Sequence, residues 1–407
     1  STGTSAVDRI LLRYGVESVT PMFPSGKTRR SDLPDISRIY RATYDKSIAP
    51  FAVAKALAAL PEVVYAEPNY TRRQYDVPND TRFNNQWHLS KISAAAAWDI
   101  SHGDSTVIIG IVDSGTDMDH PDLEANIWVN EAELNGLSGR DDDDNGYVDD
   151  IRGWDFADDD NNPDNAVPEN MHGTHVAGLA NAVTNNEVGV AGVAWNVKML
   201  ITKHGYDDDT PVIVNGFQGI VYAAELGAHV INCSWGGGGY SQYEADVIDY
   251  VTGLGALVVV ASGNENSDAL SYPSFYENVF SVAATSRSDQ RADFSNFGMW
   301  VDGATPGVSV LSTLPDESYG QASGTSMSSP VAAGAAALVK SFYPDLSPHQ
   351  LARRMAGTAD NIDSNNPDYA GLLGTGRFNA ENALAYDESQ FVIFEPKLML
   401  TKTTVSE

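Results

Sequence analysis

The stretch Thr106–Asp113 reads TVIIGIVD, a continuous apolar run that ends in a single acid. A strand that is buried on both faces of a parallel sheet has this composition, because neither face meets water. Two later runs, Ala228–Gly236 (AHVINCSWG) and Ala256–Asn264 (ALVVVASGN), are apolar in the same way and end in small or polar residues. All three are predicted to be buried strands, with functional groups just beyond their carboxyl ends.

Helical stretches lie between and after these runs. His172–Val183 (HGTHVAGLANAV) and Gly216–Gly227 (GFQGIVYAAELG) are rich in small residues, and the second ends at a glycine. Ser326–Pro344 (SMSSPVAAGAAALVKSFYP) is rich in alanine and is closed by a proline. Strands that alternate with helices predict an α/β fold, in which helices cover both faces of a parallel sheet.

The first 70 residues predict a small α+β unit that precedes this fold. A helix is expected at Phe51–Leu60 (FAVAKALAAL), because Pro61 follows it directly. Strands are expected at Arg9–Tyr14, Ser37–Tyr44 and Glu62–Tyr70. Residues 71–78 are polar and end in a proline, so they predict an exposed linker. The main domain is expected at residues 79–385, followed by a C-terminal extension at 386–407.

Acidic residues dominate the charge of the chain. Its 55 acidic and 25 basic residues give a formal net charge of −30, a field that repels nucleic acid. Between Asp113 and Glu169 there are 19 acidic residues and only two basic ones, so this segment supplies more than half of the net charge. A salt-adapted protein would be expected to spread its acid over the surface. The concentration favours bound cations instead.

Cysteine and hydropathy exclude further classes. With one cysteine, Cys233, the chain forms no intrachain disulfide. The longest apolar run, at Ala256–Ala261, is too short to span a bilayer, and the first residues lack the charged and apolar regions of a signal peptide.

Three segments carry side chains that are suited to catalysis: VDSGTDMDHPDL at 112–123, MHGTHVAG at 171–178 and SGTSMSSP at 323–330. Taken singly, each has an ordinary explanation: the acid could cap a helix, the histidine pair could bind metal, and serine-rich turns are common. Together they supply an acid, an imidazole and a hydroxyl, with SGN at 262–264 as a source of an amide donor. Hydrolysis of an amide by serine needs these parts and a donor for the oxyanion.

In the order of these motifs, the chain resembles the subtilisin-like serine proteases over roughly residues 78–384. The resemblance includes VPNDTRFNNQWHL, HPDL, NEVGVAGVA, VINCSWGG and SYPSFYENVFSVAAT, so chance similarity is negligible. It implies a subtilisin-like parallel sheet and the activity of a serine endopeptidase on protein and peptide substrates. A lipase or esterase is disfavoured, because the chain lacks the G-x-S-x-G elbow. Its catalytic residues also follow the order Asp…His…Ser, whereas those enzymes have Ser…Asp…His.

Catalytic roles follow from the resemblance residue by residue. Ser326 is the expected nucleophile, His172 the general base, and Asp113 the residue that orients the imidazole. Asn264 is expected to donate its side-chain N–H to the oxyanion. The second histidine of HGTH, His175, is interpreted as a packed helix residue.

The resemblance also implies a substrate cleft. Ser271 is expected at the base of the primary pocket and Glu265 at its rim, and the small base leaves room for large apolar side chains. Trp235 is expected to narrow the neighbouring subsite. The full predicted set is Ser234, Trp235, Gly236, Ala261, Ser262, Gly263, Glu265 and Ser271.

The acidic segment predicts calcium sites. Asp141, Asp143, Asn145 and Gly146 have the alternating spacing that wraps oxygen ligands round calcium, but Arg152 stands where an EF-hand has its closing glutamate. The candidate ligands in this loop are Asp141, Asp143, Asn145, Tyr147, Asp149 and Asp150; on the next loop they are Asp158, Asp160, Asn162 and Asp164. The alternative is a solvated acidic insertion, against which Trp154 and Phe156 count.

A further calcium site is implied by the resemblance alone. In the family a calcium ion is held by the aspartate of HPDL and by the loop that precedes a Gly-x-x-Gly turn. An aspartate near the start of the domain is an additional ligand in the thermitase-like branch. The corresponding residues are Asp122, Thr184, Asn186, Val188 and Val190, together with Asp80. Two or more calcium ions are therefore expected.

The N-terminal unit resembles a subtilisin propeptide, which implies an intramolecular inhibitor with a processing site in the linker. The alternative is a structural domain that is never cleaved. The resemblance further implies a secreted, monomeric enzyme. The rival class is a non-catalytic calcium-dependent binding protein on a protease scaffold, which the complete catalytic set disfavours.

Overall fold

A computed structural model describes residues 5–23, 36–44, 48–69, 76–165, 167, 170–207 and 212–385. The chain divides into two compact units, Ser1–Gln74 and Tyr75–Glu407. Most of the linker predicted at 71–78 and the whole extension at 386–407 lie outside the described residues.

The N-terminal unit combines two helices with a small sheet. Its elements are α1 (Ser5–Arg13), β1 (Ser18–Pro21), a 3₁₀ turn at Ile36–Arg38, β2 (Tyr40–Thr43) and α2 (Pro50–Ala58). Strands β1 and β2 pair antiparallel. The helix α2 and the strand at β2 were expected from the sequence, and the structure confirms both.

Two predicted strands of this unit are wrong. The stretch Arg9–Tyr14 lies largely in α1, and its apolar side chains explain why, since Val7, Ile10, Leu11 and Tyr14 follow the i, i+3, i+4, i+7 spacing of a helix. Residues 62–69 begin with a turn and a bend and join no ladder of the described sheets. A β-branched run becomes a strand only where a neighbour is available to pair with it.

The second unit is built on a seven-stranded parallel sheet in the order β4-β5-β3-β6-β7-β8-β9. Its strands are β3 (Ile108–Asp113), β4 (Gly153–Asp155), β5 (Lys198–Lys203), β6 (Val230–Cys233), β7 (Leu257–Ala261), β8 (Val279–Thr285) and β9 (Gly303–Pro306). The three buried strands that the sequence predicts are its centre. The α/β prediction is confirmed.

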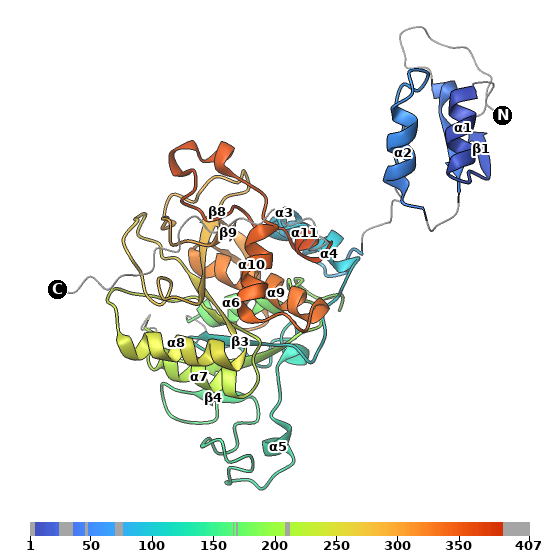
Figure 1. Cartoon of the computed structure of the whole chain (residues 1–407). Helices are drawn as coiled ribbons and strands as arrows, with labels where there is room; N and C mark the ends of the chain where they lie inside the picture. The colour runs from blue at the N-terminus through green and yellow to red at the C-terminus, as the bar shows by residue number, and fades with distance from the viewer. Residues whose placement is uncertain are drawn as a thin grey trace. The chain divides into compact units, whose positions relative to one another are not determined.

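Helices cover both faces of this sheet (Figure 1). On one face lie α7 (Gly216–Glu225) and α8 (Gln242–Leu254); on the other lie α6 (His172–Asn181), α9 (Thr325–Phe342) and α10 (Pro348–Gly357). The side chains of β3 alternate between the two cores: Ile109 and Ile111 pack in one, and Val112 in the other.

Small residues bring α6 and α9 close together. A Cβ added at Gly334 would lie 2.6 Å from the carbonyl oxygen of Ala180, so only glycine permits this approach. The close crossing holds the amino-terminal ends of the two helices, at His172 and Ser326, on the same side of the sheet as the carboxyl end of β3.

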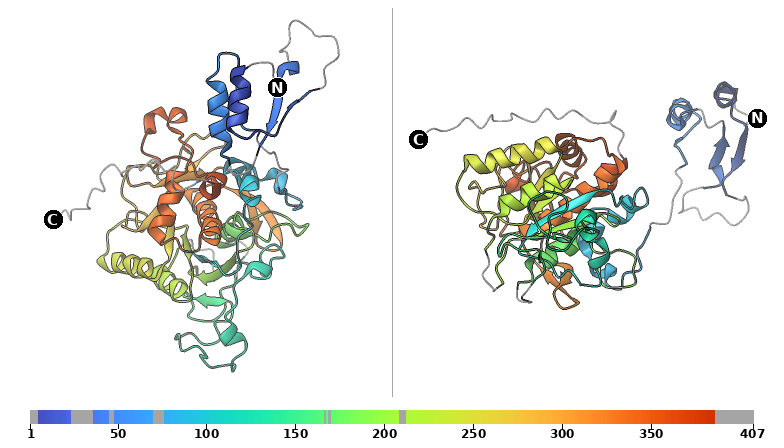
Figure 2. Two further views of the ribbon diagram at one scale, coloured as in Figure 1. Left: turned by 45° about the vertical axis from the view of Figure 1, so that its right-hand side comes forward. Right: turned by 90° about the horizontal axis from the view of Figure 1, so that it is seen from below.

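Shorter elements complete the unit. They are α3 (Trp87–Lys91), α4 (Ala94–Trp98), α5 (Glu131–Leu134), the antiparallel hairpin of β10 (Val310–Leu314) and β11 (Ser318–Ala322), and α11 (Ala380–Ala385), with 3₁₀ turns at Phe83–Asn85, Glu124–Asn126, Asp363–Asn365 and Pro367–Tyr369. The acidic insertion, which includes α5, projects from the sheet edge at β4 (Figure 2).

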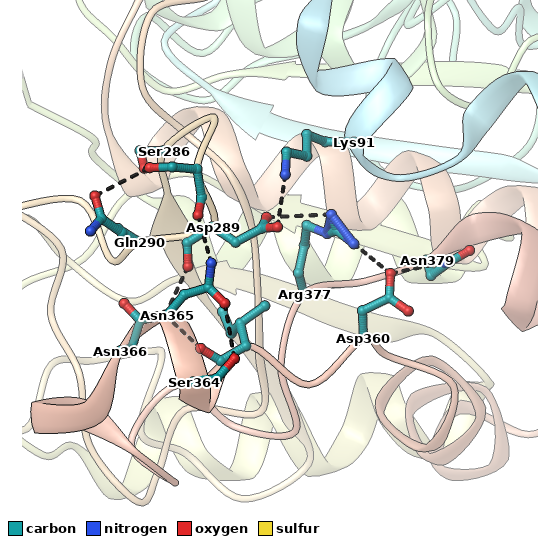
Figure 3. A network of polar contacts seen from close by, with 12 residues as sticks. Lys91, Ser286, Asp289, Gln290, Asp360, Ser364, Asn365, Asn366, Arg377 and Asn379 are labelled. Carbon is teal, nitrogen blue, oxygen red and sulfur yellow. Dashed lines mark hydrogen bonds and ion pairs between the residues drawn. The ribbon is translucent and has the colours of Figure 1, made fainter.

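A polar network fastens the C-terminal segment to the rest of the unit (Figure 3). Asp289 accepts from Lys91 at 2.7 Å and from Arg377 at 3.3 Å, and Arg377 also pairs with Asp360. Asn366 donates to the carbonyl oxygen of Asp289 at 2.8 Å. Among the described residues, no helix has the length and apolar character needed to cross a membrane.

Candidate active site

Asp113 and His172 meet where β3 ends and α6 begins. The Nδ1 atom of His172 lies 2.6 Å from Oδ1 of Asp113, which also accepts from the backbone N–H of Ser114 at 2.8 Å. Asp113 is buried, whereas the side chain of His172 is 38% exposed and so reaches the surface. An imidazole held through Nδ1 by a buried carboxylate keeps Nε2 available to take a proton.

Two effects act on the pKa of His172 in opposite directions. Burial lowers its pKa, but the charge of Asp113 and the hydrogen bond to it raise the pKa further than burial lowers it, so the net shift is upward. The carboxylate thus favours the imidazolium, which is the form that a general base takes during acyl transfer.

Ser326 is the second residue of α9, after Gly324 at the N-cap and Thr325 at the first helical position. Its hydroxyl donates to the carbonyl oxygen of Ser234 at 3.0 Å. Hydrogen bonds between a nucleophile and its base often form only when substrate is bound. At the amino-terminal end of a long helix, Ser326 also lies in the positive partial charge of the helix, which favours a developing oxyanion.

Asn264 is turned toward this helix end by Thr325. Its Oδ1 accepts from the backbone N–H of Thr325 at 2.8 Å and from the hydroxyl at 3.0 Å, which leaves the amide NH₂ free for another acceptor. A Cβ built on Gly324 would lie 3.6 Å from the backbone nitrogen of Ser326 and 3.8 Å from Nδ2 of Asn264. Two N–H donors therefore border one space that glycine keeps open.

A pocket of about 360 Å³ adjoins Ser326 and Asn264. Of the eight residues predicted to form the substrate cleft, it is lined by Ser234, Trp235, Gly236, Ala261, Gly263, Glu265 and Ser271. The exception is Ser262, which is buried and donates to the carbonyl oxygen of Asn296 at 3.4 Å.

Trp235 forms a fixed wall of the cleft. Its indole N–H donates to the carbonyl oxygen of Val112 at 2.8 Å, and its ring packs edge-on against Phe217. A Cβ at Gly216 would lie 2.7 Å from the indole ring, so the tryptophan occupies space that a side chain at 216 would need.

His175 and Cys233 lie in the interior. The Nε2 atom of His175 lies 3.2 Å from the carbonyl oxygen of Gly320, and burial lowers the pKa of His175 to about 4. Burial raises the pKa of the Cys233 thiol well above its usual range. A neutral imidazole and a protonated thiol are the expected states of both side chains.

The acidic insertion folds onto the sheet edge through aromatic contacts. The ring of Tyr147 packs edge-on against Trp154, Phe156 and Tyr222, with centroids 4.9–5.5 Å apart. Trp154 and Phe156 are both buried. The burial of these two side chains argues against a wholly solvated insertion.

Three carboxylates converge inside the insertion. Ligand atoms of Glu133, Asp143 and Asp150 lie within 4.8 Å of one another. Asn145 donates to both aspartates, at 3.2 and 2.9 Å, and Asn130 does so at 2.9 and 2.8 Å. Glu133 and Asn130 were not predicted, because they precede the loop and share no spacing motif with it. Glu133 is buried, and its carboxylate also accepts from the N–H groups of Asp142, Asp143 and Asp149, at 2.6, 3.2 and 2.9 Å.

The other predicted ligands of this loop bind backbone groups. Asp141 accepts from the N–H groups of Asn145 and Gly146, at 3.1 and 2.7 Å. Asp149 accepts from the N–H of Gly139 at 2.7 Å. The N–H of Tyr147 donates to Asn145 at 2.7 Å.

The residues predicted on the next loop do not converge on one point. Asp158 joins Asp155 and Asp207 in a group whose centre is already held by the ammonium of Lys203, at 3.6, 2.5 and 2.5 Å. Asp160 accepts from the N–H of Asn162 at 2.8 Å, and Asp164 accepts from the N–H groups of Met118 and Asn165. The cation beside Asp158 is therefore a lysine of β5, and a metal ion on this loop stays a prediction.

Asp80 and Asp122 form a second acidic group. Both are buried; Asp122 accepts from Asn186 and from the N–H of Val190, each at 2.7 Å. Burial raises the pKa of Asp122 to about 6, and the charge of Asp80 adds to the rise. Oδ1 of Asp80 is buried with no hydrogen-bond partner among the described residues.

The loop that carries Asn186 also places the remaining predicted residues. Thr184 is buried and accepts from the N–H of Gly192 at 3.0 Å, while the N–H of Val188 donates to Asn186 at 2.9 Å. Two buried carboxylates, one with an oxygen that lacks a hydrogen-bond partner, and with no lysine or arginine paired to either among the described residues, are chemically suited to a hard cation.

Comparisons with known proteins agree with this geometry. A model of the subtilase family matches residues 104–376. The thermophilic serine proteinase of Bacillus sp. (strain AK1) is 36% identical over 82% of this chain and 76% of its own length, and thermitase of Thermoactinomyces vulgaris is 36% identical over 76% and 99%. The halolysin-like extracellular serine protease Nep of Natrialba magadii is 35% identical over 80% of this chain, which spans 56% of that protein. Among solved structures, a protease from Pseudoalteromonas arctica is 32% identical, with a TM-score of 0.61, over 76% of this chain and 99% of its own.

Proposed function

The chain belongs to the subtilase family and is a subtilisin-like serine endopeptidase, and from that premise we propose that it is a secreted, calcium-stabilised enzyme made as an autoprocessed precursor. Asp113, His172 and Ser326 are its triad, and Asn264 is its side-chain oxyanion donor. The observation that carries these catalytic roles is the 2.6 Å contact between Asp113 and His172, on the side of the sheet where two N–H donors border the space beside Ser326.

The reaction follows from these positions. His172 takes the proton of the Ser326 hydroxyl as its oxygen attacks the peptide carbonyl, and the carbonyl oxygen becomes an anion between Asn264 and the N–H of Ser326. The imidazolium then gives its proton to the leaving amine, and water hydrolyses the acyl-enzyme by the same route. A fluorophosphonate tests the assignment: mass spectrometry that located the label on a residue other than Ser326 would contradict it.

Peptides with Phe, Tyr, Leu or Met before the cut are expected to be the best substrates, with some tolerance of Lys through Glu265. The reason is that the small side chain of Ser271 at the base of the pocket leaves room for them. A methyl group at Gly236 would fill part of this room, because its Cβ would lie 3.0 Å from the carbonyl oxygen of Tyr272 and 3.2 Å from Oγ of Ser271. Gly236→Ala should therefore reduce kcat/KM for Phe peptides by roughly 10–200-fold.

Gly238→Ala is the matched control for this prediction, because Gly238 lines the same pocket and a Cβ there would meet nothing within 4 Å. It should leave the ratio of Phe to Lys cleavage unchanged. A peptide library cleaved strictly after Asp or Gly would contradict the proposed pocket.

Two groups support calcium in the folded enzyme. The carboxylates of Glu133, Asp143 and Asp150 lie within reach of a single ion. Asp80 and Asp122 are buried, and in the part of the chain that the structure describes no lysine or arginine pairs with them. Oxygen ligands of this kind suit calcium, which would neutralise charge that is otherwise repulsive. No step of the proteolytic reaction is assigned to the metal.

Removal of calcium is expected to lower the melting temperature and to speed self-digestion, because an ion that binds only the folded state stabilises it, by about 2.7 kcal/mol at a hundredfold excess over Kd. Glu133→Gln should weaken this response, as measured by scanning calorimetry over a calcium series. Glu131→Gln removes the same charge from an exposed position on α5 and should leave the response intact. Metal analysis that found less than one calcium per chain after gentle dialysis would contradict the prediction.

The N-terminal unit is proposed to be an inhibitor that the enzyme cleaves from itself. Its support is the resemblance of FAVAKALAALPEVVYAEPNY to a propeptide and the polar linker that follows, since cleavage concentrates in such segments. Arg72 and Arg73, an alternative target for an external protease, lie outside the described residues.

Refolding in calcium is expected to yield two fragments from the wild type, cut between about Asn69 and Pro78, and a full-length chain from Ser326→Ala. A gel with time points and mass spectrometry of the fragments measure this. A full-length wild-type chain that hydrolyses peptides would show that the N-terminal unit is a permanent domain.

A further inference from the structure

Asn296 lies behind the loop that carries Asn264. It follows β8 in the sequence and is 2% exposed. Its Oδ1 accepts from the N–H groups of Glu265 and Ser267, at 3.0 and 3.1 Å, and its Nδ2 donates to the carbonyl oxygen of Ser262 and to Oε2 of Glu265, at 3.0 and 2.7 Å. One side chain thus holds three residues of the loop, on both sides of Asn264.

These four contacts use the full capacity of an asparagine amide, which has two N–H donors and an oxygen that accepts twice. They also fix its orientation, because a flipped amide would set NH₂ against two N–H groups and oxygen against a carbonyl and a carboxylate. The amide is therefore complementary to the loop at every contact.

The backbone of the loop is shaped to receive this side chain. Gly263 has a φ of +107°, and a Cβ there would lie 2.4 Å from Nδ2 of Asn296 and 2.6 Å from Oε2 of Glu265. The N–H of Asn296 also donates to the carbonyl oxygen of Gly263 at 2.9 Å. Glycine at 263 lets the amide lie directly against the main chain.

On its other side, the loop is joined to the helix of the nucleophile. Gly263 donates its N–H to the hydroxyl of Thr325 at 3.1 Å, and Asn264 accepts twice from Thr325. The loop is thereby clamped between Thr325 in front and Asn296 behind. The NH₂ of Asn264 can keep a fixed position only while both sides hold.

We propose that Asn296 is the positioning residue for the oxyanion donor Asn264, and that it also orients Glu265 at the rim of the pocket; the proposal rests on the proposed function. Asn296 also lines the pocket, but all four hydrogen bonds of its amide go to the loop, so it acts through Asn264 and Glu265. Its importance follows from the small displacement that an oxyanion donor tolerates. The donor must stay within about 0.5 Å of its productive position, and a displacement of about 1 Å can reduce the rate by 10²-fold.

The decisive experiment is a double-mutant cycle between the two asparagines, read by kcat and KM on a Phe peptide. Asn264→Ala should lower kcat by roughly 10²–10³-fold. Asn296→Asp keeps the shape and the two accepting contacts but sets oxygen against the carbonyl of Ser262 and the carboxylate of Glu265. Alone it should lower kcat by roughly 10–100-fold with little change in KM. In the Asn264→Ala background it should lower kcat by less than about 3-fold, because the donor that it positions is gone.

Asn366→Asp is the matched control. Asn366 is a buried asparagine outside the substrate pocket, and it accepts from the N–H of Arg291 at 2.7 Å and donates to the carbonyl oxygens of Asp289 and Ile362. Its substitution should lower the melting temperature while leaving kcat within about 2-fold of the wild type. If Asn296→Asp does not fold, Asn296→Ser, which keeps a donor and an acceptor, takes its place in the cycle.

Addition of Glu265→Gln to Asn296→Asp gives an independent test. The new amide can donate to the new carboxylate, so kcat should recover several-fold even though the contact with Ser262 stays broken. The positioning role would be overturned if the losses of kcat in Asn264→Ala and Asn296→Asp multiplied in the double variant. It would also be overturned if Asn366→Asp lost as much kcat as Asn296→Asp. An unchanged kcat in Asn264→Ala would instead contradict the proposed oxyanion donor, so the two failures are distinguishable.

Discussion

Replacement of Ser326 by alanine is expected to reduce kcat by about 10⁶-fold, the loss found when the serine of a subtilisin is removed. The reason is that the oxygen that attacks the substrate is gone, while the acid, the imidazole and the oxyanion donors cannot replace it. The fold should be little affected. The hydroxyl makes one hydrogen bond, to the carbonyl oxygen of Ser234, and the loss of such a bond changes the free energy of unfolding by about 1 kcal/mol.

Peptide hydrolysis and calorimetry on the same samples measure both effects. Ser341→Ala is the matched control: Ser341 lies in the same helix and also donates one hydrogen bond to a carbonyl, that of Ala337 at 2.8 Å. It should keep full activity at a similar melting temperature. Wild-type activity in Ser326→Ala would refute the assignment of the nucleophile, and with it the catalytic reading of the whole cleft.

The sheet could be predicted from the sequence because its central strands are buried on both faces. Such strands are plain apolar runs, and in Ile108–Asp113 and Leu257–Ala261 all but the first residue of the former are buried. Their length distinguishes them from helices. The helices between them end at glycine or proline, as Gly227 and Pro344 indicate.

The N-terminal unit was harder to predict, because its elements are short and exposed. All four residues of β1 are exposed, so no alternation of apolar and polar side chains marks the strand. The nine residues of α1 cover little more than two turns, and the apolar run within them on its own predicts a strand. Short segments leave too few positions to separate a period of 2 from one of 3.6.

The candidate site was predictable to the extent that its chemistry is local in sequence. Asp113, His172 and Ser326 stand in recognisable motifs. Glu133 shares no spacing motif with the loop that carries Asp143, although Asp143 follows it by only ten residues. Asn296 stands in a motif of the family, but it holds a loop about 30 residues earlier in the chain, so only the fold shows this contact. Lys203 shows the same limit: it pairs with Asp158, one of the predicted ligands, and also with Asp155 and Asp207, and no spacing motif indicates these contacts.

Replacement of Asp113 by asparagine is expected to reduce kcat by roughly 10⁴-fold without loss of the fold. The side chain keeps its shape, but its amide can donate to Nδ1 of His172. The imidazole proton then resides on Nε2, where it faces the serine, so the ring cannot accept the proton of Ser326. The loss is chemical, since the two side chains can remain at the distance of 2.6 Å that they have in the wild type.

The same substitution should move the acid limb of the pH profile of the remaining activity to lower pH. In the wild type, the carboxylate of Asp113 raises the pKa of His172 against the effect of burial. Activity must then fall as the pH drops through this raised pKa, because only the neutral imidazole is a base. Without the carboxylate, burial alone acts on the ring, and it lowers the pKa. Measured kcat/KM profiles test the sign, with Asp119→Asn as control, because it removes a charge from an exposed residue that pairs with Arg152 rather than with His172. An acid limb that stayed in place, or moved to higher pH, in Asp113→Asn would show that the carboxylate does not set the pKa of the base.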